Sequence, residues 1–60
     1  MKVLVGTFNE EDLRQGRDKV EVAKAKEEHN LKYTEMKYVK KGGNIVGLKI
    51  WVCDFDTFTI

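Results

Sequence analysis

Proline is absent from the sequence, and cysteine and histidine each occur only once among its 60 residues. A single cysteine cannot form an internal disulfide, and one Cys with one His cannot supply the four ligands of a structural zinc site. The apolar opening, residues 1–5, is too short for a signal peptide or a membrane span. We therefore expect a soluble, cytoplasmic protein that does not contact a membrane and whose lone thiol stays reduced.

A chain of this length has room for one domain, which we expect to span residues 1–60. A folded chain of this size buries only about 60% of the surface that its unfolded form exposes, so its stability is marginal. Because disulfides and structural zinc are excluded, association with other copies becomes the leading way to complete the core. The chain begins with Met1 and carries no recognisable tag, from which we expect a whole gene product.

The charge is nearly balanced, with 11 basic and 10 acidic residues, but it is unevenly spread along the chain. Residues 31–50 contain five lysines and a single acidic residue, Glu35, whereas residues 10–30 and 51–60 are net acidic. A domain that binds polyanions is usually basic as a whole, with its basic side chains on one face. Only the middle third of this chain meets that condition.

Residues 2–8 are rich in β-branched and apolar types and predict a first strand. One helix is expected over about residues 9–29, because Asn9 can cap it and three acidic residues follow in its first turn. Its apolar stripe is thin, so we expect it to cover one face of a sheet through a narrow seam. The predicted core consists of Val3, Val5, Leu13, Val20, Ala23, Leu48 and Ile50.

The second half of the chain predicts a β-hairpin. Residues 31–39 alternate polar and apolar side chains as in a half-exposed strand, and residues 40–44 contain the glycines that a hairpin turn needs. Residues 45–55 form the most apolar stretch and are expected to be the central strand, with Gly47 at a bulge or a close contact. Residues 55–60 alternate again, as a fourth strand or as an arm.

These elements predict an α+β fold of the order β-α-β-β. One helix packs on a three-stranded, mainly antiparallel sheet, which becomes four-stranded if residues 55–60 add a strand. The preferred strand order is 2-3-1, with the most apolar strand in the middle, and the alternative is 1-2-3 with a right-handed crossover. Either order leaves one sheet face bare, and large aromatic side chains there indicate an interface. We expect copies of the chain to meet through Trp51, Cys53, Phe55 and Phe58.

No constellation in the sequence favours catalysis or a bound metal. His29 and Cys53 are the only nucleophile–base pair, but a His at a helix end and a Cys in an apolar strand are both common as structural residues. Asp54 and Asp56 are too few for a calcium site, which needs six to eight oxygen ligands. We expect a protein that is not an enzyme and that holds no cofactor and no metal.

One group of residues is typical of a nucleic-acid-binding surface. Lysines of the hairpin alternate with aromatic residues, and sheet surfaces hold single strands by placing basic side chains near phosphates and aromatic rings on bases. The residues are Lys32, Tyr33, Lys37 and Lys49, with Trp51 close by. The other interpretation, favoured by the balanced total charge, is an exposed hairpin whose lysines guard its edge against aggregation.

Trp51 permits a third interpretation, because an aromatic side chain on a bare sheet face can stack on a flat cofactor such as a flavin. The β-α-β-β order at this length resembles that of the dodecins, which are hollow flavin-storing assemblies. The tryptophan of that family lies before the hairpin turn, whereas Trp51 lies after it. The resemblance implies an oligomer that binds a flavin or another small ligand, and it assigns a role to no residue of this chain.

The leading hypothesis is a non-enzymatic protein-interaction module that acts as a homo-oligomer. A chain this small has little volume for a pocket with its supporting shell, so we expect it to occupy the surface of a larger partner, as bacterial or phage regulators and inhibitors do. The predicted partner-binding residues are Tyr38, Lys40 and Lys41 at the hairpin tip, where acidic side chains are scarce. A nucleic-acid-binding regulator is the alternative, and the flavin-binding oligomer comes third.

Overall fold

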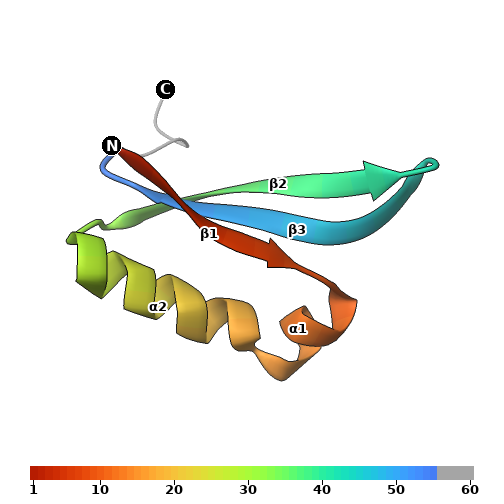
Figure 1. The fold of residues 1–60 in the computed structure, drawn as a ribbon, viewed down its shortest axis with the longest axis horizontal. Coiled ribbons are helices and arrows are strands. Elements are labelled where there is room, and N and C mark those ends of the chain that lie inside the picture. The colour runs from red at the N-terminus through yellow and green to blue at the C-terminus, as the bar shows by residue number, and fades with distance from the viewer. Residues whose placement is uncertain (56–60) are drawn as a thin grey trace.

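The computed structural model describes residues 1–55, which form three strands and two helices in two layers (Figure 1). The elements in chain order are β1 (Lys2–Phe8), α1 (Glu10–Gln15), α2 (Arg17–His29), β2 (Tyr33–Lys41) and β3 (Asn44–Cys53). Both helices lie on the same side of the sheet, and the other side carries none of these elements (Figure 1). The predicted α+β class is therefore confirmed, and the predicted extra strand at residues 55–60 falls almost entirely outside the described residues.

The sheet is antiparallel throughout and has the order β1-β3-β2, which confirms the predicted position of the most apolar strand between the other two. β2 and β3 form the expected hairpin. Gly42 and Gly43 make its turn with φ of 59° and 83°, a left-handed conformation that glycine adopts without steric cost. In the register, Val52 stands opposite Val3 of β1 and Thr34 of β2.

The prediction of a single helix over residues 9–29 is wrong, because Gly16 divides it. Gly16 adopts a left-handed φ of 77° and its N–H donates to the carbonyls of Asp12 and Leu13, so it ends α1 and starts α2. The predicted cap at Asn9 is confirmed. Its side chain accepts a hydrogen bond from the Asp12 N–H at 2.8 Å, and the Asp12 carboxylate accepts one from the Asn9 N–H at 3.2 Å, which together form a capping box.

The core of residues 1–55 differs from the one that the sequence predicts. Within these residues the buried apolar side chains are Phe8, Leu31, Ile50, Val52 and Cys53. Of the predicted core residues, Ile50 is buried, four are half-buried, and Val20 and Ala23 are exposed. The break at Gly16 explains the exposure of Val20 and Ala23. The predicted apolar stripe joined them to Leu13 on one helix face, which requires a continuous helix.

The helices cover only part of one sheet face. α2 packs against β1 and β3, and α1 packs against β1. β2 lies beyond this cover, so its helix-side residues Met36 and Tyr38 remain 53% and 63% exposed. The described part of the chain therefore has a sheet that is wider than its helical layer.

Gly47 brings β3 close to the end of β1. The register with β2 passes from Val39↔Gly47 to Lys40↔Ile45, which leaves Val46 as the extra residue of a bulge. A Cβ atom on Gly47 would lie 3.0 Å from the carbonyl oxygen of Phe8, closer than ordinary van der Waals contact. The prediction of a bulge or close contact at Gly47 is confirmed.

Gly47→Ala should therefore lower the free energy of unfolding by about 1–3 kcal/mol, because the new methyl group meets backbone rather than a movable side chain. The measurement is urea unfolding. Asn44→Ala is the control, since Asn44 is exposed in the same strand and receives the same alanine side chain, and its effect should stay within about 0.5 kcal/mol. Equal stability of Gly47→Ala and the parent chain would show that the Phe8 carbonyl is not held against β3.

Candidate functional site

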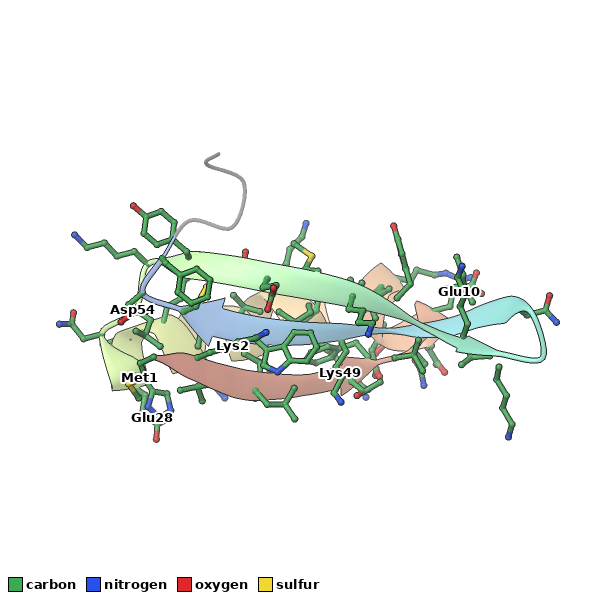
Figure 2. The ribbon with its side chains drawn as sticks, turned by 90° about the horizontal axis from the view of Figure 1, so that it is seen from above. Met1, Lys2, Glu10, Glu28, Lys49 and Asp54 are labelled. Atoms are coloured by element: carbon green, nitrogen blue, oxygen red, sulfur yellow. The ribbon has the colours of Figure 1, made fainter. Side chains whose placement is uncertain are left out.

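The sheet face away from the helices carries the only tryptophan at its centre. The ammonium group of Lys2 lies 4.6 Å from the centroid of the Trp51 ring, and that of Lys49 lies 5.5 Å from it. Both distances are within the range of cation–π attraction. Figure 2 looks onto this face, with Lys2 and Lys49 in front of the sheet and the helices behind it.

The register adds further charges to this face. Lys37 of β2 stands directly opposite Lys49 of β3, and Glu35 stands opposite Trp51 and forms an ion pair with Lys2. Like charges that face each other across a strand pair repel. Lys37 and Lys49 therefore create a local excess of positive charge beside the indole ring. We call Lys2, Lys37, Lys49 and Trp51 the Trp51 cluster.

The predicted nucleic-acid residues partly coincide with this cluster. Lys37 and Lys49 belong to it, and Tyr33 occupies the same face at the end of β2, opposite Cys53. Lys32 is exposed but lies in the connection before β2. Lys2 was missed by sequence reasoning, because only the β1–β3 register brings the first strand beside Trp51.

The predicted oligomer residues do not form one exposed apolar surface. Trp51 is half-buried among charged side chains, and Phe55 is exposed after the end of β3. Cys53 shares the face of Trp51 in the register, as expected, but it is fully buried there and its thiol donates to the Phe55 carbonyl at 3.2 Å. It packs within its own chain instead. Phe58 lies outside the described residues.

A different apolar surface lies on the helix side of the hairpin. We call it the helix-side flank, and its members are Met36, Tyr38, Ile45 and Val46. All four are exposed, and three of them border a hollow of about 230 Å³ that also contacts Leu13 of α1 and Leu48 of β3. The flank is the part of the helix-side sheet surface that α1 borders but that neither α1 nor α2 covers.

The predicted partner-binding residues lie at the far end of the hairpin. Lys40 and Lys41 are exposed beside the turn, and Tyr38 is exposed two residues earlier. None of the ion pairs among the described residues involves Lys40 or Lys41. The tip thus presents two ammonium groups to solvent, and Tyr38 belongs both to this group and to the helix-side flank.

His29, Cys53 and Asp54 are the titratable residues of the described part of the chain that the sequence analysis singles out. Within residues 1–55 there is no group of three or more His, Cys, Asp and Glu side chains that could hold a metal ion. His29 ends α2, whereas the Cys53 thiol bonds the Phe55 carbonyl. The Met1 ammonium, 2.7 Å from Asp54, donates a hydrogen bond that holds the pKa of that carboxyl below its usual value. Neither α1 nor α2 is long and apolar enough to cross a membrane.

No family model matches the chain, and comparisons with curated proteins and with solved structures give no match either. The described residues present three candidate surfaces: the Trp51 cluster, the helix-side flank and the hairpin tip.

Proposed function

We propose that this protein is a small non-enzymatic interaction module that acts as a homo-oligomer in the cytoplasm. In this role it is a regulator or inhibitor, of the kind that bacteria and phages encode, and it occupies the surface of a larger partner. The single observation that carries the proposal is the helix-side flank, where large apolar side chains stay exposed because the helical layer is too narrow.

Burial of apolar surface supports association between copies. Each Å² of apolar surface removed from water contributes about 25 cal/mol. Only five apolar residues are buried in the described part of a single copy, whereas the four residues of the flank remain in water. A second copy that covers the flank enlarges the buried apolar area without lengthening the chain.

Met36→Lys should weaken self-association about tenfold or more, because it places a charge in the apolar contact; tenfold corresponds to about 1.4 kcal/mol. Leu4→Lys is the matched control. Leu4 is 51% exposed, compared with 53% for Met36, and it also lies in an outer strand, but on the face that carries Trp51. The measurement is sedimentation velocity over a range of protein concentrations.

Two results would contradict the assignment of the flank as the contact. Equal dissociation constants for Met36→Lys and the parent chain would show that the flank is not buried between copies. A loss confined to Leu4→Lys would place the contact on the helix-free face, as the sequence prediction for Trp51 has it.

The hairpin tip is the surface that we assign to the larger partner. Lys40 and Lys41 project beside a glycine turn, and their free ammonium groups suit an acidic patch on a protein surface. Tyr38 adds apolar contact area at a modest cost in side-chain entropy. Neither Lys40 nor Lys41 belongs to the Trp51 cluster or to the helix-side flank, so these two lysines can be changed without replacing a residue of either surface.

Lys40→Glu combined with Lys41→Glu should abolish capture of the partner from a cell lysate, because it reverses the charge of the tip. Lys19→Glu combined with Lys24→Glu on α2 makes the same change of charge at exposed positions and should leave capture intact. The captured proteins are compared by mass spectrometry at two salt concentrations, with circular dichroism and sedimentation as checks on folding and oligomeric state. If the tip variant retains the same proteins as the parent chain, the tip is only a turn.

A second candidate function, binding of single-stranded nucleic acid, is favoured by the Trp51 cluster. Bases stack on exposed aromatic rings, and lysines beside the ring follow the phosphates. Lys37 and Lys49 face each other across β2 and β3, so an anion that bridges them relieves their repulsion. This candidate differs from the first in its ligand and in the face of the sheet that it uses.

A ten-nucleotide oligothymidylate should quench the fluorescence of Trp51, the single tryptophan of the chain, at low salt. Two or three neutralised phosphates predict a slope of log affinity against log salt of roughly −1.4 to −2.1. Lys37→Gln with Lys49→Gln should weaken binding, whereas Lys19→Gln with Lys24→Gln should not. Absence of quenching at low salt would rule out this function, and quenching by flavin mononucleotide alone would favour the flavin-binding alternative.

A further inference from the structure

Within residues 1–55, β2 pairs with a strand on one side only, so its other edge is open to an additional strand. β3 lies in the middle of the sheet, so β1 and β2 are its two edges. The register of β1 with β3 shifts between Leu4 and Gly6, whereas that of β2 runs without interruption from Tyr33 to Val39. An irregular edge resists pairing, and a long regular edge presents a row of unpaired N–H and C=O groups to another strand.

We infer that β2 pairs antiparallel with β2 of a second copy, around a two-fold axis that passes beside Met36. This inference rests on the proposed homo-oligomer and specifies its contact. The two sheets join into one sheet of six strands, with the helices of both copies on the same side. Strand addition at an exposed edge is a common mode of recognition, in which main-chain hydrogen bonds provide affinity and side chains set the register.

Symmetry limits the registers that are allowed. A two-fold axis perpendicular to the sheet keeps each residue on the same face in both copies. Residues that stand opposite each other must share a face, and side chains alternate along a strand. The axis must therefore pass beside a residue that stands opposite the same residue of the second copy. The uninterrupted stretch of β2, residues 33–39, has Met36 at its midpoint.

Charge separates this register from its neighbours. With Met36 at the axis, Glu35 of each copy faces Lys37 of the other, which gives two attractive pairs on the helix-free face. With Glu35 at the axis two carboxylates oppose each other, and with Lys37 at the axis two ammonium groups do. Opposite charges that face each other across strands stabilise by roughly 0.2–1 kcal/mol per pair, and like charges destabilise.

The apolar residues fit the same register. Met36 contacts Met36 of the second copy, and Tyr38 faces its Thr34, so both exposed members of the flank on β2 gain a covering neighbour. On the opposite face Tyr33 faces Val39. The ion pair of Glu35 with Lys2 is compatible with this arrangement, because a carboxylate has two oxygens that each accept hydrogen bonds.

The test is disulfide formation by single cysteines at three successive positions. Under mild oxidation Met36→Cys should form a dimer in high yield, because its two copies face each other, whereas Glu35→Cys and Lys37→Cys should not. A mixture of the Glu35→Cys and Lys37→Cys proteins should form a mixed disulfide, since these two positions face each other. The parent chain is the control for Cys53, which is buried, and peptide mapping identifies the linked residues.

The mixed disulfide keeps the test decisive if Met36→Cys folds poorly. The register would be overturned if only Lys37→Cys or only Glu35→Cys formed a disulfide dimer. It would also be overturned if no variant and no mixture formed one. If sedimentation still gives an oligomer for the parent chain in that case, the homo-oligomer stands and only the pairing of β2 fails. If the parent chain sediments as a monomer, the proposed function fails together with this inference.

Discussion

The helical layer of this protein is narrower than its sheet, and the rest of the structure depends on that mismatch. α1 and α2 together contain 19 helical residues and pack on β1 and β3, so β2 receives no comparable cover. The buried core is accordingly limited to five apolar residues in the described part of the chain. Residues that would enlarge a core, Met36 and Tyr38 among them, lie instead on a surface that α1 and α2 leave exposed.

Much of the fold can be read from local patterns. The strands, the hairpin turn and the cap at Asn9 each depend on residues close together in sequence, and the central position of β3 follows from its apolar character on both faces. The break at Gly16 was not predicted, because one glycine within a strongly charged helical pattern is compatible with a continuous helix. That break displaced the predicted stripe and left Val20 in solvent. Phe8 was missed because the register shift between Leu4 and Gly6 reverses the alternation of side chains along β1. Leu31 was missed because it lies in the connection between α2 and β2, outside any periodic pattern.

The candidate surfaces were harder to predict, because they depend on register between distant segments. The alternation of lysines and aromatic residues correctly groups Lys37 and Lys49 near Trp51, since all three belong to one hairpin. Lys2 is 49 residues away from Trp51 in the sequence and joins the cluster only through the pairing of β1 with β3. Cys53 was expected on a bare face, but residues near a strand end are easily covered by the chain that follows. The helix-side flank could not be foreseen, because strand periodicity does not indicate how far a helix reaches across a sheet.

We propose that one copy of the chain leaves apolar surface of the helix-side flank in water and that a second copy covers it. The most direct measurement is the sedimentation-equilibrium mass of the unmodified protein from micromolar to nanomolar concentration. We expect a mass at least twice the 7.0 kDa of one chain at the highest concentration, falling toward 7.0 kDa on dilution. A mass of 7.0 kDa at every concentration, with a cooperative unfolding transition that does not depend on concentration, would contradict it.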